Sequence, residues 1–386
     1  MTAYLSFFPV ANGDMTLMQT EEGHKILIDL NIRADADDPD KDEPDVAAKL
    51  KDKLSRDDEG RFFVDALLLS HPDEDHCRGL RKHFHLGPPD EWSKSSDKIL
   101  IREIWSSPMV FRRASRRHVL CDDAKVFNAE ARRRVRRFRD TPWLVGDGDR
   151  ILILGEDEEG KTDGLQEILI RMGTEFSHVN GQHDRSMKAL LLAPLPAEDQ
   201  DDEEVLSKNN SSTILRFSLA GGENQDKCRF LTGGDAEVAI WKKLWNRYCW
   251  RADWLSYDIL LSPHHCSWHS LSHDSWSELG EKAEVSEDAR NALSQARDGA
   301  TIVASSNPIK NDDNDPPCIR AKREYEAIAE DAAGIFVCVG EHPSEKSPDV
   351  MEFEISAHGL RLTTALMGAP SILGAGAIGR QPLSHG

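Results

Sequence analysis

One short segment, LLLSHPDEDHCRGL (residues 67–80), constrains this chain more than any other. Directly after an apolar run it places His71, Asp73, Asp75 and His76 within six positions. Like charges this close together are unfavourable unless something positive lies among them. Imidazole and carboxylate groups are ligands for zinc, manganese and iron. The segment therefore predicts a metal site at the end of a buried strand, against the alternative of a solvated acidic loop.

Three further predicted strands end in polar residues that could join the same site. They are FLTGGDAE (230–237) with Asp235, DILLSPHHCSWHS (258–270) with His264 and His265, and TIVASSNP (301–308) with Ser305 and Asn307. Small residues at such ends let the backbone approach a ligand closely. Strand ends along one edge of a sheet are where sites in α/β proteins form. For Asp235 the alternative is a turn-forming role, and for the two histidines a structural one. Ser305 and Asn307 could line the substrate pocket, against the alternative of an ordinary turn before Pro308.

Apolar runs typical of strands recur along the whole chain. They lie at 3–10, 15–20, 25–30, 62–70, 98–105, 150–155, 187–194, 212–219, 228–233, 257–263, 301–306, 334–340 and 350–356. The run at 62–70 is apolar on both faces, as in a sheet covered on both sides. Helical patterns at 236–250 and 316–334 fall between strands, the second with prolines at its start and Gly334 at its end. This order predicts two sheets with helices packed outside.

Several of these segments together resemble a known family. HPDEDH is similar to the His-x-Asp-x-Asp-His signature of metallo-β-lactamase-fold hydrolases, in the branch of the competence protein ComEC. The opening FFPVANGDMTLMQTEEGHKILIDL and the blocks MKALLLAP, NNSSTILRF, RFLTGGDAE, YDILLSPHHCS and IVASSNP resemble that branch in the same order. The resemblance covers residues 3–365. It implies an α/β protein, a four-layer αβ/βα sandwich with a dinuclear metal site where the strands end.

The resemblance also implies a role for each matched residue. His71 and Asp73 fall at the first metal position, Asp75 and His76 at the second, Asp235 at the bridging carboxylate, and His264 or His265 at the last histidine. Which of the two adjacent histidines is the ligand stays open, and the other, like Asp75, is a candidate for proton transfer. Asp14 and Asp29 also resemble family positions, but we expect them to fix loops through backbone hydrogen bonds.

The chemistry expected of such a site is metal-dependent hydrolysis. Two cations a few ångströms apart can hold a hydroxide at neutral pH and stabilise charge on a phosphoryl or carbonyl oxygen. Asp73, where most of the superfamily has histidine, shifts the site from zinc toward manganese or magnesium. We expect one or two such ions and a phosphodiesterase or nuclease acting through the metal-bound hydroxide. The alternatives are an ester, lactone or amide hydrolase, and a binding or regulatory protein that has lost turnover.

A basic segment, residues 107–140, is the second notable feature. Its apolar residues recur at helical spacing and arginines occupy most remaining positions. One interpretation is an amphipathic helix packed on the domain. The other is a basic surface that draws an anionic substrate, a nucleic acid or nucleotide, toward the metals through residues such as Arg133, Arg136 and Arg137. The net charge of −20 weighs against a general nucleic-acid binder.

The remaining composition bounds the organisation of the chain. We expect one domain over residues 1–365, with insertions at about 107–140 and 156–186, and a flexible glycine-rich tail at 366–386. Seven scattered cysteines do not resemble a disulfide framework, which favours the cytoplasm. No apolar run is long enough to span a bilayer, so we expect no membrane partner. Whether the chain has a protein partner cannot be read from the sequence.

Overall fold

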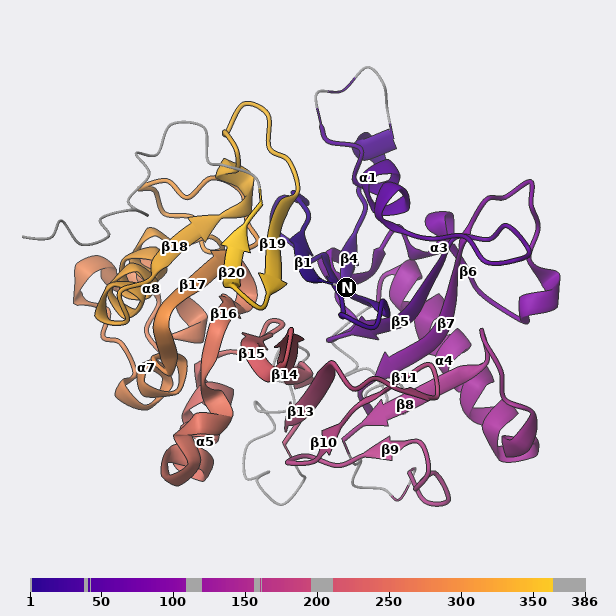
Figure 1. The fold of residues 1–386 in the computed structure, drawn as a ribbon. Coiled ribbons are helices and arrows are strands. Elements are labelled where there is room, and N and C mark those ends of the chain that lie inside the picture. Colours follow the sequence, from indigo (N-terminus) through magenta and orange to yellow (C-terminus); the bar gives the residue numbers. More distant parts are fainter. Residues whose placement is uncertain are drawn as a thin grey trace, which may run out of the picture.

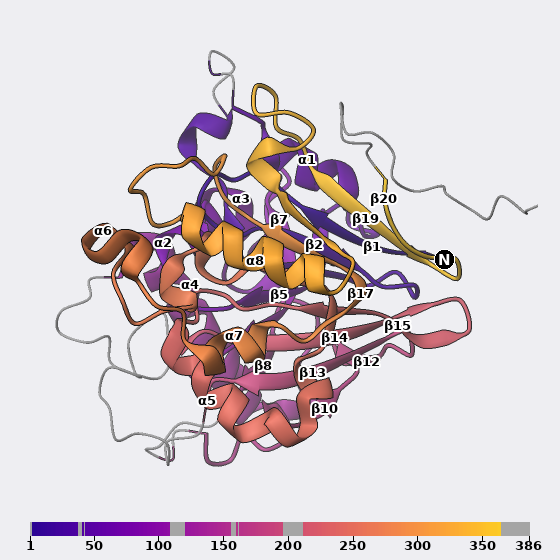
Figure 2. The same cartoon turned by 90° about the vertical axis from the view of Figure 1, so that its left-hand side faces the viewer.

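The computed structural model describes residues 2–37, 41, 43–108, 120–155, 160, 162–195 and 211–363. The predicted tail (366–386) lies outside these residues, as do parts of both predicted insertions (109–119, 156–159 and 161). Two β-sheets lie face to face, and helices cover the outer face of each (Figures 1 and 2). The predicted α/β sandwich of four layers is confirmed.

The first sheet is antiparallel at one end and parallel at the other. Its strand order is β20-β19-β1-β2-β3-β5-β7-β8-β9, with β6 beside β7. The strands are β1 (Ala3–Phe7), β2 (Thr16–Gln19), β3 (Lys25–Ile28), β5 (Phe63–Leu69), β6 (Phe84–His85), β7 (Ile99–Ser106), β8 (Arg150–Leu154), β9 (Leu169–Ile170), β19 (Met351–Ser356) and β20 (Gly359–Leu362). Pairing is parallel from β3 to β9, so the carboxyl ends of these strands share one edge.

The second sheet repeats this plan. Its order is β10-β13-β14-β15-β16-β17-β18, with parallel pairing from β15 to β18. The strands are β10 (Glu175–Phe176), β13 (Met187–Ala193), β14 (Ile214–Gly221), β15 (Asn224–Leu231), β16 (Tyr257–Leu261), β17 (Ala296–Ala304) and β18 (Ile335–Cys338). The short strands β4 (Leu30–Asn31), β11 (His178–Val179) and β12 (Gln182–His183) stand apart from both orders.

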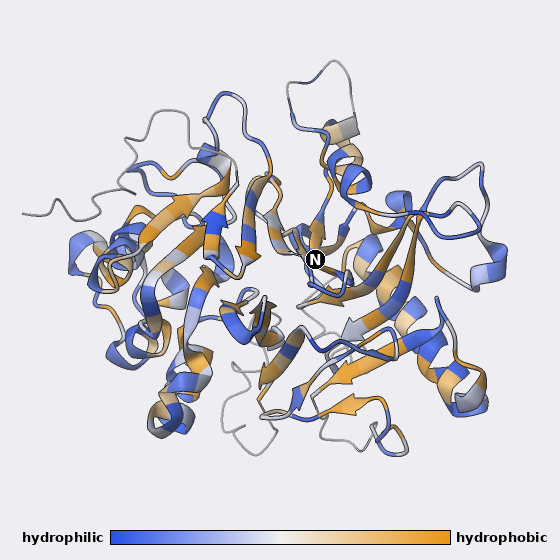
Figure 3. Cartoon of the chain, viewed as in Figure 1, coloured by the Kyte–Doolittle hydropathy of each residue, from blue (hydrophilic) through white to orange (hydrophobic). Residues whose placement is uncertain are grey.

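The central core lies between the two sheets. Successive side chains of β5 point to opposite faces of the sheet: Leu68 faces the other sheet and joins this core, while Leu67 and Leu69 face the helices. Phe7 of β1 packs edge to face on Phe230 of the second sheet, with ring centroids 5.8 Å apart. Figure 3 shows the strands as the apolar part of the molecule and the helices as mixed. Strands buried on both faces therefore hold the two halves together.

Helices form the two outer layers. The first sheet carries α1 (Val46–Lys53), α2 (Glu74–Cys77), α3 (Leu80–His83) and α4 (Asp122–Asp140). The second sheet carries α5 (Val238–Tyr248), α6 (Trp276–Leu279), α7 (Glu287–Leu293) and α8 (Ile319–Asp331). As the sequence predicted, α8 begins shortly after two prolines and ends shortly before Gly334. Among the helices of the described residues, none combines the length and apolar character that crossing a membrane requires.

Helix α4 is the basic segment predicted from the sequence. Ala124, Phe127, Ala131 and Val135 are buried against the first sheet, which is the amphipathic packing expected from their spacing. The sulfur of Cys121 accepts the N–H of Ala124 and caps the start of the helix. The helix is therefore a component of the outer layer.

Candidate metal centre

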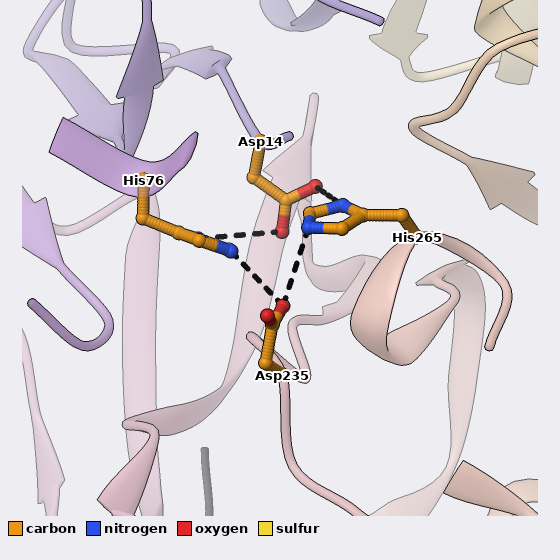
Figure 4. A group of neighbouring side chains, drawn as sticks. All are labelled: Asp14, His76, Asp235 and His265. Atoms are coloured by element: carbon orange, nitrogen blue, oxygen red, sulfur yellow. Dashed lines mark ion pairs between the residues drawn. The ribbon is translucent and has the colours of Figure 1, made fainter. Parts of the chain in front are cut away.

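Two groups of potential metal ligands meet where the strands of both sheets end. Asp14, His76, Asp235 and His265 each offer a ligand atom, and these atoms lie within 4.8 Å of one another (Figure 4). His71, Asp73 and Asp235 form a second group that meets the same limit. Asp235 belongs to both. We call the first the inner group, because all four residues are buried, and the second the outer group, because Asp73 reaches solvent.

Asp235 stands between the two groups, with one carboxylate oxygen toward each. Its Oδ1 lies 2.9 Å from Nε2 of His76 and 3.4 Å from Nε2 of His265. Its Oδ2 lies 3.5 Å from Nε2 of His71 and 3.6 Å from Nε2 of His264. One carboxylate thus reaches both groups, and the bridging role that the family resemblance implies for Asp235 stays a prediction.

The turn after β15 has little room, which explains its two glycines. Gly234 adopts φ +47°, and a Cβ there would lie 3.0 Å from the side chain of Ser212. At Gly233 a Cβ would lie 2.7 Å from Pro263. The Ser212 hydroxyl accepts the backbone N–H of Asp235 at 3.1 Å. The turn therefore holds Asp235 against the neighbouring strand ends.

The HPDEDH segment supplies candidate ligands to both groups, from the turn after β5 and from the short helix α2. His71 follows β5, and Asp73 is the residue before α2, its Oδ2 3.6 Å from Nε2 of His71. His76 lies in α2 and points to the inner group. Asp75 lies beside the inner group on its solvent side. Its Oδ2 is 3.4 Å from Nε2 of His265, and about a third of its side chain is exposed.

Asp29 orients His76 from behind. Its Oδ2 lies 2.8 Å from Nδ1 of His76 and accepts the hydroxyl of Ser70 at 2.6 Å, while Oδ1 accepts the backbone N–H of Ser70 at 2.7 Å. A proton on Nδ1 shared with this carboxylate leaves Nε2 of His76 free to bind a cation. The expected loop-fixing role of Asp29 is present, and it extends to a ligand.

The structure distinguishes the two adjacent histidines, which the sequence could not. Both lie in the one-turn helix η9 (Pro263–His265) after β16. His264, His265 and Cys266 have φ values of +52°, +53° and +68°, a region that costs non-glycine residues energy. The strained turn directs His265 into the inner group, while His264 lies on the side of the outer group. The N–H of His264 donates to the carbonyl of Gly234 at 2.9 Å and ties this loop to the Asp235 turn.

Asp14 is the residue whose place the sequence reasoning missed. We expected it to fix a loop, but its side chain is buried in the inner group, with Oδ1 3.4 Å from Nδ1 of His265. The loop that carries it is pinned from several sides. Ser305 donates its hydroxyl to the carbonyl of Gly13 at 2.6 Å, and the side chain of Asn31 donates to two carbonyls of the same loop. The sequence signals were the Asn-Gly-Asp turn after the first strand and the resemblance of Asp14 to a family position.

Ser305 and Asn307, predicted to contact substrate, also contact this loop. The Ser305 hydroxyl is buried and already donated to Gly13. Asn307 is exposed, and its backbone N–H donates to the side chain of Asn12 at 3.0 Å. Both residues therefore help to position Asp14 from the end of β17, and a direct contact with substrate stays a prediction.

The predicted substrate-binding arginines of α4 do not reach the ligand groups. Arg133 pairs with Glu130 and Asp149, and Arg137 lies 3.5 Å from Asp149. Asp149 immediately precedes β8, so these pairs lie at the opposite end of the parallel strands from His71. Arg136 is exposed on the same helix. Carboxylates of the domain thus neutralise two of these arginines, as the amphipathic-helix interpretation expects.

Charges within the ligand groups shift several pKa values. Burial alone would lower the pKa of His265, but the carboxylates of Asp235 and Asp14 outweigh it and raise this pKa to about 10. Burial would likewise lower the pKa of His76, but Asp235 and Asp29 raise it. Burial would raise the pKa of Asp235, but the three nearby imidazoles hold it well below the ordinary value. The acids thus favour positive charge among them, which a bound cation would supply.

The unpartnered atoms of these residues fit a metal ion. Within the described structure, several buried polar atoms of the two groups and of the adjacent His264 make no hydrogen bond. They are Asp14 Oδ1, His71 Nε2, His76 Nε2, Asp235 Oδ1, His264 Nδ1, and both ring nitrogens of His265. Buried polar groups are nearly always paired, so a cluster of unpaired ones needs an explanation. The imidazole nitrogens and carboxylate oxygens are the donor set of a zinc or manganese ion.

Comparisons with known proteins give little direct guidance. No family model and no curated protein matches the sequence. Among solved structures, the chain is similar to the isothiocyanate hydrolase from Delia radicum gut bacteria, with 14% identity over 86% of this chain and 95% of that chain and a TM-score of 0.38. It is also similar to unliganded yeast PDE1, with 13% identity over 87% and 98% and a TM-score of 0.37. Both likenesses are low, so we base the functional proposal on the chain's own residues.

Proposed function

We propose that the protein is a metal-dependent hydrolase of the metallo-β-lactamase fold, in the ComEC-like branch, and that it cleaves phosphodiesters. The observation that carries this proposal is the position of Asp235, whose Oδ1 faces His76 of the inner group and whose Oδ2 faces His71 of the outer group. A carboxylate in this position suits two cations about 3.5–4 Å apart, the spacing of two-metal phosphoesterases and nucleases. The ordered motifs of residues 3–365 support the family.

His71, Asp73 and Asp235 would hold one cation, and Asp14, His76, Asp235 and His265 the other. Such ions supply Lewis-acid stabilisation of charge on phosphoryl oxygens. Carboxylates make up half of the inner group and two of the three residues of the outer group, which favours manganese, with zinc or magnesium as alternatives. The identity of the ion is open to direct measurement.

The chain's own residues divide the remaining tasks. Asp29 holds His76 in the tautomer that presents Nε2 to the site. Asp75 and His264 lie on the solvent side, with their side chains 35% and 16% exposed, while His71, His76 and Asp235 are buried. An anionic substrate, a nucleotide or nucleic acid, would therefore enter past Asp75 and His264. Asp75, a carboxylate within reach of solvent, is placed to accept or pass a proton.

The test begins with metal analysis of protein purified without a histidine tag. Hydrolysis of bis-p-nitrophenyl phosphate and of p-nitrophenyl acetate is then compared with manganese and with zinc. We expect bound metal and preferential cleavage of the phosphodiester, with both lost in Asp235→Asn. Asp65→Asn is the matched control, since Asp65 is equally buried but accepts from Lys25 and Arg102 elsewhere in the sheet. Cleavage of the carboxylic ester alone would establish the alternative hydrolase, and metal-free, inactive protein would overturn the proposal.

A further inference from the structure

Two cysteine sulfurs lie in contact beside the metal centre without belonging to it. Cys77 is the last residue of α2 and directly follows His76, while Cys121 caps the start of α4. Their Sγ atoms are 3.6 Å apart, and both thiols are free. They come from positions 44 residues apart, so the fold has brought them together.

The surroundings of Cys121 favour its reaction with an oxidant. The residue is partly exposed, and its sulfur accepts the N–H of Ala124 at 3.3 Å at the start of a 19-residue helix. A hydrogen bond from Cys77 is the main cause that lowers the pKa of Cys121 to about 6, against the opposing effect of burial, and the Ala124 N–H adds to it. Thiolates at helix N-termini are the reactive form of cysteine. Cys77 is fully buried.

We propose that Cys77 and Cys121 form a reversible disulfide on exposure to a peroxide, and that this bond changes the metal centre. The Cys121 thiolate and one proton react with hydrogen peroxide, giving a sulfenic acid and water as the O–O bond breaks. The Cys77 thiol then attacks the sulfenic sulfur, the S–S bond forms, and a second water leaves. Two thiols and one peroxide thus become one disulfide and two waters.

Bond formation must bring the two sulfurs closer, through movement at α2, at the start of α4, or at both. A disulfide is about 2.05 Å long, so the sulfurs have to approach by roughly 1.5 Å from their present separation. The Cys77 thiol also lies 2.9 Å from the carbonyl oxygen of Asp73, and oxidation removes the proton it can donate there. Helix α2 has only four residues, among them Asp75 and His76, and begins after Asp73. The consequence for metal binding rests on the proposed function, whereas formation of the disulfide does not.

The test separates these two parts. Full-length protein is treated with stoichiometric hydrogen peroxide, alkylated, digested without reduction and mapped by mass spectrometry. We expect a Cys77–Cys121 cross-linked peptide about 2 Da lighter than the sum of its free parts, which dithiothreitol reverses. Cys121→Ser should abolish the cross-link, because the variant has no sulfur at this position. The fold should be preserved, because serine is a good N-cap. Cys249→Ser, which removes an exposed thiol elsewhere, should leave the cross-link unchanged.

Metal affinity of the reduced and oxidised protein is measured by competition with a chromophoric chelator for manganese and for zinc. We expect about a tenfold loss on oxidation, of the size seen when groups behind a ligand are disturbed, and no loss in Cys121→Ser. Sulfinic acid at Cys121 with free Cys77 would overturn the disulfide. A complete cross-link with unchanged metal affinity would overturn the effect on the metal centre, without touching the proposed hydrolase.

Discussion

Replacing Asp29 by asparagine would test how the metal centre is built. Asp29 adopts φ +53°, a conformation that asparagine tolerates as well as aspartate does. The shape of the side chain is also unchanged. The substitution therefore removes one property, the ability of both oxygens to accept hydrogen bonds from Ser70 and from Nδ1 of His76.

The new amide group has two ways to turn, and each has a cost. With its NH₂ toward His76, it donates to Nδ1 and forces the ring proton onto Nε2, the nitrogen 2.9 Å from Asp235 and aimed at the inner group. Loss of an orienting partner of this kind lowers metal affinity about 10–100-fold, or about 1.4–2.7 kcal/mol. With its NH₂ toward Ser70, a buried donor faces another donor, which costs about 1–3 kcal/mol of folding stability.

Chelator competition measures the first effect, and urea unfolding of the metal-free protein measures the second. If the first orientation dominates, we expect metal affinity to fall by at least tenfold. If the second dominates, we expect the free energy of unfolding to fall by about 1–3 kcal/mol. A mixture of the two orientations should give smaller losses of both. Asp65→Asn, with an equally buried carboxylate away from the ligands, should leave metal affinity unchanged. If Asp29→Asn folds normally and binds metal as tightly as the native chain, Asp29 does not orient His76 in the way we describe.

Two further predictions concern other contacts. The hydrogen bond to Asp184 raises the pKa of His24 despite burial. Protonated His24 therefore stabilises the folded state fully at pH values below its pKa in the unfolded chain, near 6.5, and this stabilisation is lost as the pH rises through its pKa in the folded state. The free energy of unfolding in urea should fall by about 1–2 kcal/mol from pH 6 to pH 9, and His24→Gln should remove that part of the slope; identical slopes would contradict this. In Gly13→Ala the new Cβ would lie 2.1 Å from Nδ2 of Asn31, so the Asp14 loop must shift and metal affinity should drop about tenfold. Gly146→Ala, where a Cβ meets nothing within 4 Å, is its control, and equal affinity in the two variants would show that the loop is not needed.

The sequence alone predicted those features that depend on the residues of a single helix or strand. The continuous apolar run that forms β5, the apolar spacing of α4 and the prolines before α8 each predicted the element that formed. The clustering of His71 to His76 at the end of β5 followed from the same reasoning, since six consecutive positions cannot lie far apart. The two-sheet arrangement could also be predicted, because strands apolar on both faces require cover on both sides.

Tertiary structure decided everything that depends on which segments meet. The sequence places Asp14 and Asp235 more than two hundred positions apart, yet their carboxylates share the inner group. The choice between His264 and His265 depends on a strained turn that a backbone hydrogen bond from His264 to Gly234 ties to the Asp235 loop. Likewise the arginines of α4 look free in the sequence, but Asp149 before β8 pairs with two of them. Periodicity and propensity act over a few residues, whereas ligand sets and ion pairs are fixed by contacts between chain segments that only the folded core brings together.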